Sequence, residues 1–344
     1  MITIGIDPHK ASITAVAIGA DGAVIARARL VVDRDLLARL LEFTQRFPER
    51  RWGVEGASGL GLGVAQALVS AGESVVDVPA SLAARARLLS TGAGRKTDAA
   101  DALAVALVAQ HHHGLRRVQP EDQATVMRLV VDHREELVGE RTTVVNRLHK
   151  LLRELIPGGA PVRLTAKQAS ELLRHARPQT EADRVRKDLA RDLLTGIRHL
   201  DARIAAVTKQ IETLVAASGT TLTEITGVGP IVAATIIGHT GDITRFPTAG
   251  HYASFNGTAP VDASSGENTR RRMNRLGHRR LNSALHIVAV TQMARPSPGR
   301  TYYQVKKAES KTPREARRAL KRRLSDVIYR RLRREQLRAL RHAS

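Results

Sequence analysis

Short apolar runs alternate with amphipathic segments along the first third of the chain. This pattern predicts strands at residues 2–6, 12–19, 24–30, 51–55 and 74–78, and helices at about 34–46, 60–71 and 97–110. The pair Asp21-Gly22 supplies a hairpin turn between the second and third strands. Three meandering strands followed by alternating helices and strands are the element order of an RNase H-like sheet, so we expect an α/β fold here.

Two heptad seams follow within a highly charged segment, from about 120 to 216. Apolar residues of the first seam are Leu137, Val144, Leu148, Leu151 and Leu155, and those of the second are Leu193, Ile197, Leu200, Ile204, Val207, Ile211 and Leu214. Such helices can form an antiparallel hairpin, pair with another subunit, or build the core of an ordinary bundle. We favour a helical coiled-coil spacer that pairs with another subunit.

The last third opens with a glycine-containing turn in "LTEITGVGPIVAATIIG", residues 222–238. Gly227 and Gly229 resemble the turn of a helix-hairpin-helix motif, whose backbone N–H groups hold a phosphate without reading sequence. Three apolar residues fall where such a hairpin must pack: Ile225, Ala233 and Ile236. The alternative is a turn between helices that serves folding alone.

Basic residues outnumber acidic ones by 55 to 33, and the formal net charge is +22. The excess is local, because residues 267–344 hold 23 Lys and Arg against 5 acids and include a basic amphipathic helix at about 313–341. A polyanion is the expected partner. Aromatic residues make up only 3%, which argues against base-stacking platforms. We predict nucleic-acid contacts from Gly227, Gly229, Arg270, Arg271, Arg272, Arg275, Arg279, Arg280, Arg317, Arg318, Arg322 and Arg323.

Several classes of protein are excluded by composition. The chain has no cysteine, which rules out disulfides and Cys-based zinc sites. No run approaches the roughly 18 apolar residues of a membrane span, and the start MITIGIDPHK lacks the apolar core of a signal peptide. We expect a soluble, cytoplasmic protein that does not bind membranes. Its 344 residues suggest two or three domains, and we place three, at 1–118, 119–217 and 218–344.

Four carboxylates are candidates for one site. Asp98 and Asp101 are three residues apart and share a helix face, although capping by Thr97 and the helix dipole explain this pair better when it is taken alone. Asp7 and Glu55 end two predicted strands, and such strand ends converge at one edge of a sheet. Because four carboxylates repel one another, the cluster needs cations. Two Mg²⁺ ions about 4 Å apart would neutralise it and stabilise a phosphate undergoing in-line displacement. The alternative is a set of surface acids.

The stretch "APVDASSGENTRRR" places two serines before an arginine triplet. A serine hydroxyl becomes a nucleophile when it is positioned and activated, and cationic neighbours would hold a phosphodiester against it. Serines beside glycine usually make turns, however. On these residues alone, Ser264 and Ser265 are better explained by a turn.

Several motifs resemble one family when they are taken in order. They are "GIDPHK", "VEGASG" and "GRKTDAADALAVA", then a long helical spacer, then "ITGVGPIVAATII" and "APVDASSG". Together they resemble the DEDD transposases of bacterial insertion sequences, the insertion-sequence one-ten family, over nearly the whole chain. The resemblance implies a RuvC-like catalytic domain whose metal ligands correspond to Asp7, Glu55, Asp98 and Asp101. It also implies a mainly helical C-terminal transposase domain with Ser265 as nucleophile.

The resemblance also implies a mechanism and partners. Members are recombinases that form a covalent phosphoserine link, and a noncoding bridge RNA guides them to donor and target DNA. They assemble as dimers and as a tetramer, in which the acidic cluster of one subunit and the serine of another make a composite site with two Mg²⁺ ions. The resemblance also implies that the protein is bacterial and is associated with the nucleoid. Members commonly have a basic residue after Ser-Gly, whereas this chain has Glu267 and Asn268, so the adjacent Ser264 stays an alternative nucleophile.

Two other classes of function remain open on the sequence. A stand-alone RNase H-like nuclease, such as a junction resolvase, would hydrolyse DNA with metal-activated water and need no serine. A noncatalytic RNA-binding regulator would have no use for the four carboxylates. Covalent protein–DNA adducts would indicate the recombinase, and free DNA ends the nuclease.

Overall fold

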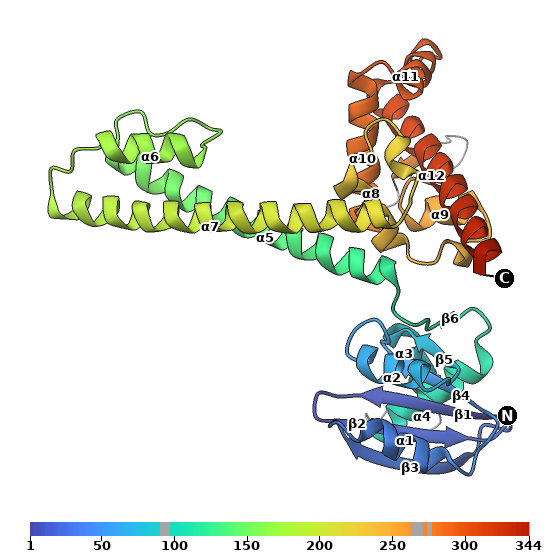
Figure 1. The fold of residues 1–344 in the computed structure, drawn as a ribbon. Coiled ribbons are helices and arrows are strands. Elements are labelled where there is room, and N and C mark those ends of the chain that lie inside the picture. Colours follow the sequence, from blue (N-terminus) through green and yellow to red (C-terminus); the bar gives the residue numbers. More distant parts are fainter. Residues whose placement is uncertain (90–96, 263–270, 274–276, 344) are drawn as a thin grey trace. The chain divides into compact units, whose positions relative to one another are not determined.

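The chain divides into two compact units in the computed structural model, Met1–Glu121 and Asp122–Ser344 (Figure 1). The structure describes residues 1–89, 97–262, 271–273 and 277–343. Strands of the first unit are β1 (Ile2–Pro8), β2 (Ser12–Ile18), β3 (Val24–Val31), β4 (Arg50–Glu55), β5 (Val75–Val78) and β6 (Arg116–Arg117). Its helices are α1 (Leu36–Thr44), α2 (Leu62–Ser70), α3 (Ala80–Leu89) and α4 (Asp98–His111).

The first unit is built on one mixed sheet with the strand order β3-β2-β1-β4-β5-β6. β1 is antiparallel to β2 and parallel to β4, and β4 is parallel to β5. This order confirms the RNase H-like sheet predicted from the sequence. The prediction missed α3, in which only Ala83 is buried, and β6, which has two exposed residues. Neither segment has the apolar periodicity from which elements are predicted.

Both faces of the central strands are covered, which accounts for their continuous apolar runs. Alternate residues of β1, such as Ile4 and Ile6, pack with α1 and α2 around the fully buried Trp52. On the opposite face, Val16 and Ile18 of β2 pack against α4. The edge strand β3 alternates between exposed and half-buried residues instead.

Helix α4 lies unusually close to the sheet because small residues meet at the contact. A Cβ atom on Gly5 of β1 would overlap the backbone carbonyl of Ala102 and the backbone nitrogen of Ala106. A Cβ atom on Gly53 of β4 would likewise overlap the side chain of Ala109. This packing sets the first turn of α4 beside the ends of β1 and β4.

The second unit is mostly helical. Its elements are α5 (Gln123–Leu155), α6 (Ala166–His175), α7 (Glu181–Ala217), η1 (Leu222–Glu224), α8 (Pro230–Thr240), η2 (Ile243–Arg245), α9 (Ala249–Phe255), β7 (Pro260–Asp262), β8 (Arg271–Met273), α10 (Arg279–Ala294), α11 (Pro298–Ala308) and α12 (Pro313–Ala343). Among the described residues, no helix is long and apolar enough to cross a membrane.

Helices α5 and α7 pack side by side in opposite directions. The Gln123 side chain donates to the Leu214 carbonyl at 3.4 Å near one end, and Arg186 pairs with Glu154 at 3.0 Å near the other. Buried residues at this contact include both seam positions and their neighbours: Leu137, Leu148, Leu152, Leu194, Ile197, Leu200 and Ile211. One chain therefore buries much of both seams in an antiparallel hairpin, the first of the arrangements that the heptads allow.

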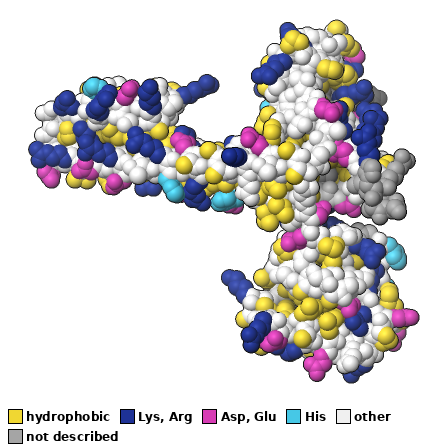
Figure 2. Space-filling model, viewed as in Figure 1, with side chains coloured by type: hydrophobic (Ala, Val, Ile, Leu, Met, Phe, Trp, Pro, Cys, Tyr) yellow, Lys and Arg dark blue, Asp and Glu magenta, His cyan; other side chains and the backbone are white. Residues whose placement is uncertain are grey.

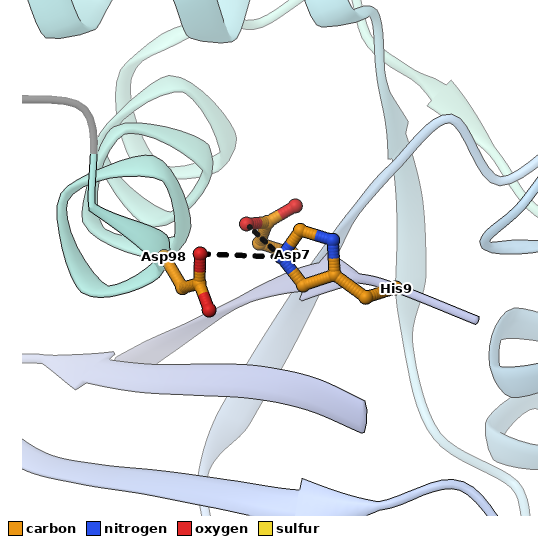
Figure 3. A group of neighbouring side chains, drawn as sticks. All are labelled: Asp7, His9 and Asp98. Atoms are coloured by element: carbon orange, nitrogen blue, oxygen red, sulfur yellow. Dashed lines mark ion pairs between the residues drawn. The ribbon is translucent and has the colours of Figure 1, made fainter. Parts of the chain in front are cut away.

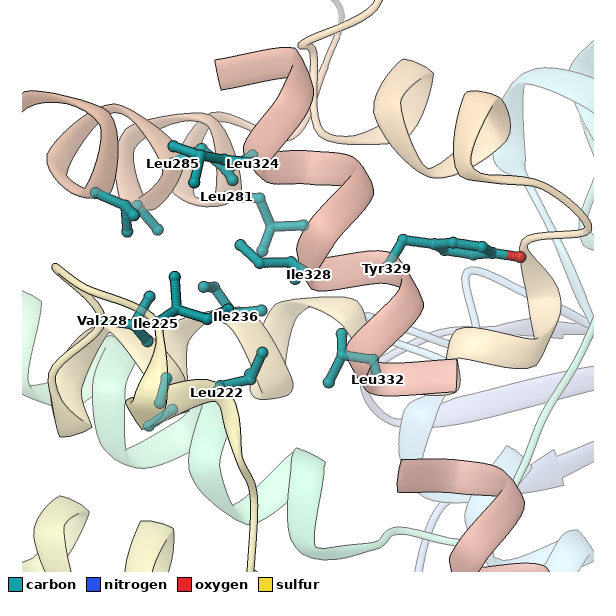
Figure 4. Packing of buried hydrophobic residues seen from close by; sticks show 14 of the residues in the cluster. Leu222, Ile225, Val228, Ile236, Leu281, Leu285, Leu324, Ile328, Tyr329 and Leu332 are labelled. Carbon is teal, nitrogen blue, oxygen red and sulfur yellow. The ribbon is translucent and has the colours of Figure 1, made fainter. Parts of the chain in front are cut away.

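A second apolar core joins α8, α10 and α12 (Figure 4). The three residues expected to pack at the glycine turn, Ile225, Ala233 and Ile236, are all buried in this core. α12 contributes Leu324, Ile328, Tyr329 and Leu332, and the Tyr329 hydroxyl donates to the Phe246 carbonyl at 2.8 Å. The apolar side of α12 is thus fixed in this core.

We expect Gly5→Ala to destabilise the chain by about 1–3 kcal/mol, because the added methyl group forces α4 away from β1. Urea unfolding followed by circular dichroism measures the loss. Gly63→Ala in α2 is the matched control, since a Cβ atom there meets nothing within 4 Å. Equal stability of the two variants would show that the close contact of α4 with the sheet is not required.

Candidate functional site

Two of the predicted carboxylates lie at the carboxyl ends of neighbouring parallel strands. Asp7 is next to the last residue of β1, and its side chain is buried, with 7% of the residue exposed. Glu55 is the last residue of β4 and is half-buried. The register pairs Ile6 with Val54, so the two acids follow at the same edge of the sheet.

The loop after Glu55 is held by an aspartate that sequence reasoning missed. Asp77 of β5 accepts hydrogen bonds from the Ala57 backbone N–H at 2.9 Å and from the Ser58 hydroxyl at 3.0 Å. Arg116 of β6 pairs with the same carboxylate at 2.9 Å. Asp77 therefore acts as a positioning residue for the chain that leaves Glu55.

The other two carboxylates lie in the first turn of α4. Thr97 caps the helix by accepting a hydrogen bond from the Ala100 backbone N–H at 3.2 Å, which confirms the predicted N-cap. Asp98 and Asp101 follow on one face but in different surroundings. The Asp98 side chain is 40% exposed and that of Asp101 12%.

His9 joins Asp7 and Asp98 (Figure 3). Its Nε2 atom lies 3.3 Å from Asp7 Oδ2 and 3.4 Å from Asp98 Oδ1. Within the described ranges, these three residues are the group that could hold a metal ion, with ligand atoms within 4.8 Å of one another. The sequence signal was present as the Asp-Pro-His of "GIDPHK", but His9 was not predicted. The structure thus brings Asp7 and Asp98 together.

Cationic side chains pair with the carboxylates of α4 in this structure. Arg29 of β3 lies 3.6 Å from Asp98, and Arg87 of α3 forms an ion pair with the buried Asp101. Asp101 and Glu55 therefore lie beside the three-residue group rather than within it. The arginines offset the mutual repulsion of the acids.

The donor set fits a hard divalent cation. Carboxylate oxygens are the ligands that Mg²⁺ and Mn²⁺ prefer, and one imidazole is compatible with Mn²⁺. A hollow of about 460 Å³ adjoins Asp98 and has two arginines of β3 in its wall. It is lined by Thr14, Arg27, Ala28, Arg29, Thr97, Asp98 and Ala99. The site therefore has carboxylates for a cation with cationic side chains next to them.

The glycine turn in the second unit is built tightly on one side and open on the other. Gly227 has φ +91°, and a Cβ atom there would lie 3.1 Å from Cβ of Thr291 on α10. The Gln292 side chain donates to the Thr226 carbonyl at 2.8 Å. Gly229 is exposed and precedes Pro230, the first residue of α8. A single 3-10 turn, η1, comes before it where a helix-hairpin-helix would have a helix.

Arg280 belongs to a partly exposed group of ion pairs between α5, α8 and α10. It forms ion pairs with Asp132 and with Glu135, the latter at 2.8 Å, and His239 Nε2 lies 3.1 Å from Asp132. Burial lowers the pKa of His239 to about 4, so this histidine is neutral at pH 7. Two acids therefore compensate the charge of Arg280 within the chain, and its contact with nucleic acid stays a prediction.

The remaining predicted arginines differ in how available they are. Arg279, Arg318 and Arg323 are exposed, Arg317 is half-buried, and Arg322 pairs with Asp326. Figure 2 shows Lys and Arg side chains gathered along α12. Ser264, Ser265, Arg270 and Arg275 lie outside the described residues. Arg271 and Arg272 are described only as backbone in β8.

The chain is similar to transposases along most of its length. Residues 4–157 match a family model described as a transposase, of the DEDD type, and residues 219–304 match one described as transposase IS116/IS110/IS902 family. A protein of insertion element IS116 from Streptomyces clavuligerus is 30% identical over 98% of this chain and 96% of its own. A protein of insertion element IS110 from Streptomyces coelicolor is 29% identical over 69% of this chain and 71% of its own. RuvC of Thermus thermophilus, solved with a Holliday junction substrate, aligns with 34% of this chain and 99% of its own, at 20% identity and a TM-score of 0.28.

Mg²⁺ should raise the melting temperature of the wild-type protein, because an ion that binds only the folded state stabilises it, by about 2.7 kcal/mol at 100 times its Kd. Asp98→Ala should remove most of this rise. Asp35→Ala is the control, since Asp35 is an exposed acid of the same unit. Scanning calorimetry with and without MgCl₂ measures the difference. An undiminished rise in Asp98→Ala would place the Mg²⁺ site elsewhere.

Proposed function

This chain belongs to the IS116/IS110/IS902 family of transposases, and from that premise we propose that it excises and inserts an insertion sequence through a phosphoserine intermediate. The observation that carries the proposal is the convergence of Asp7, His9 and Asp98 at the sheet edge where β4 also ends in Glu55. DNA is therefore the substrate, and strand cleavage and rejoining is the reaction.

Four side chains would hold the metal: Asp7, Glu55, Asp98 and Asp101. Two Mg²⁺ ions in each composite site would neutralise these carboxylates and stabilise charge on the reacting phosphate. Asp77 positions the loop after Glu55, and Thr97 fixes where the turn bearing Asp98 begins. His9 and Arg87 hold the acids in place when they are not engaged by a cation. Arg27 and Arg29 on β3 are placed to hold DNA phosphates beside the acids.

Ser265 would supply the nucleophile. Its Oγ gives up its proton and forms a bond to phosphorus while the bond from phosphorus to the deoxyribose oxygen breaks, and the released oxygen takes up a proton in turn. The phosphoserine ester conserves the bond energy, so a hydroxyl of another strand can reverse the step and rejoin the DNA. The family match over residues 219–304, which contain both serines, supports this assignment.

A noncoding guide RNA would select donor and target DNA. The support is compositional: a cationic C-terminal third with few aromatic residues contacts backbones rather than bases. Base pairing by an RNA would supply the missing sequence specificity. The turn at Gly227 and Gly229 would hold a phosphate in the manner of a helix-hairpin-helix.

The active assembly would be a tetramer of two dimers, in which the acids of one subunit meet the serine of another. We assign residues 1–118 to catalysis, 119–217 to a coiled-coil spacer that contributes to assembly, and 218–344 to the serine-bearing domain. Partly exposed seam residues of α7, such as Ile204 and Val207, leave apolar surface for such contacts.

Reconstituted strand exchange tests the proposal directly. Purified protein is mixed with labelled donor and target DNA, with and without RNA transcribed from the DNA flanking the gene. Wild-type protein should give recombinant DNA and a covalent adduct on denaturing gels only when the RNA is present. Asp98→Ala should give neither while still binding nucleic acid, since it removes a metal ligand and leaves the basic surface intact.

The two serines serve as variant and matched control. Ser265→Ala should assemble with RNA and DNA but form no adduct, whereas Ser264→Ala should retain activity. An adduct mapped to Ser264 would move the nucleophile by one residue. Cleavage that persists in the double variant, with free DNA ends, would indicate the alternative function, a nuclease that uses metal-activated water.

A further inference from the structure

A cleft of about 910 Å³ in the second unit lies between α12, the end of α11 and the segment 257–260. Most of its charged lining is basic and includes Lys311, Arg318 and Arg323, which are exposed. Lys321, in contrast, is buried, with only 8% of the residue exposed. Lysine is rarely buried unless it is paired with an opposite charge, so this residue requires an explanation.

The Lys321 ammonium group is held by an amide of fixed orientation. Its Nζ atom donates to Oδ1 of Asn282 on α10 at 2.5 Å. The Asn282 side-chain nitrogen donates to the carbonyls of Asn256 and Gly257, both at 3.0 Å, so only its oxygen can face the lysine. An ammonium group has three donors, and this contact uses one. A neutral donor such as glutamine would serve the contact equally well.

No carboxylate within the described residues pairs with Lys321. The acids that line the cleft are engaged elsewhere: Glu309 with Lys306 at 2.7 Å, Glu315 with Thr312 at 2.7 Å, and Asp326 with Arg322. Lys321 is therefore a buried cation in the lining of the cleft, and the acids of that lining interact with other residues.

The charged neighbours of Lys321 are basic. Arg317 lies on its own helix, and His286 of α10 is close enough for Lys321 to lower its pKa, although burial is the larger cause. Burial first, and then Arg317, lower the pKa of Lys321 to about 8. A buried charge without a partner is unfavourable, and an anion from outside the chain would relieve it.

We propose that this cleft seats a phosphodiester group of the DNA strand on which the transposase acts, with Lys321 as its buried ligand and Arg318 and Arg323 at the rim. The segment 257–260 that lines the cleft continues into β7, which leads along the chain toward Ser264 and Ser265. This inference rests on the proposed function.

Binding measurements on the full chain test whether Lys321 holds a DNA phosphate. Lys321→Met is compared with Lys307→Met, which removes the same charge from an exposed site of α11. The probe is a fluorescent 30-base-pair DNA duplex of mixed sequence, titrated over a range of NaCl concentrations. Lys321→Met should weaken binding about ten-fold and lower the salt slope by about 0.9, as for one lost phosphate contact. Lys307→Met should weaken binding less than about three-fold.

An RNA duplex of the same length distinguishes the source of the phosphate. Weaker DNA binding by Lys321→Met, with or without an effect on RNA binding, supports the proposed phosphate site. Weakening confined to RNA would overturn the assignment to DNA. Equal effects of the two lysine variants on DNA binding would overturn the site itself.

Proton uptake gives a second readout that needs no variant. A phosphate favours the charged form of Lys321, so this lysine should take up about half a proton when the protein binds DNA at pH 8 and almost none at pH 6.5, where it is already charged. Calorimetry in two buffers of different ionisation enthalpy measures this uptake. His286 contributes little at pH 8 because its pKa is lowered from 6.5. Absence of uptake by the wild type, or the same uptake in Lys321→Met, would contradict the proposal.

Failure of this inference is distinguishable from failure of the proposed function. If Lys321 holds no phosphate, the adduct on Ser265 and its dependence on Asp98 are unaffected. If no adduct forms, the binding and proton-uptake measurements still report whether the cleft takes up DNA.

Discussion

The close contact between α4 and the central strands is the interaction on which the candidate site depends. Gly5 and Gly53 allow the helix to lie against β1 and β4, and its first turn then reaches the acids at the strand ends. The same contact creates an electrostatic cost, because several carboxylates are forced together in a partly buried place. Arg29 and Arg87 offset that cost in the protein itself, and His9 lies between Asp7 and Asp98. A group of carboxylates that could hold a cation is thus compatible with a folded chain that has none.

The second unit carries many cationic side chains on a stably packed helical frame. α12 is anchored through one apolar side, with Leu324 and Ile328 in the core. Some of its arginines form ion pairs within the protein, as Arg331 does with Glu224 at 2.6 Å. Others, such as Arg318 and Arg323, remain exposed, and Lys321 is buried next to them. Net charge therefore overstates the number of side chains available to a nucleic acid.

The sequence predicted what depends on periodicity and strand ends. The apolar runs were sufficient to predict the order of the strands in the sheet. The predicted ends of two strands were sufficient to place Asp7 and Glu55 at one edge of that sheet. The contacts of His9, Asp77 and Lys321 could not be predicted, since each joins segments that only folding brings together. The ion pair of Arg280 with Asp132 could not be predicted either, because it joins α10 to α5. The serines lie outside the described residues, and their role remains a proposal.

Metal occupancy at the sheet edge is the most direct test of the whole account. Crystals of the full-length chain soaked in MnCl₂, with diffraction data collected at the manganese absorption edge, would locate bound ions by their anomalous signal. We predict a peak between the carboxylates of Asp7 and Asp98, with Glu55 or Asp101 turned toward a bound ion. No peak at saturating Mn²⁺, with His9 still between the two aspartates and Arg87 still paired with Asp101, would contradict the assignment of these acids to a catalytic metal site.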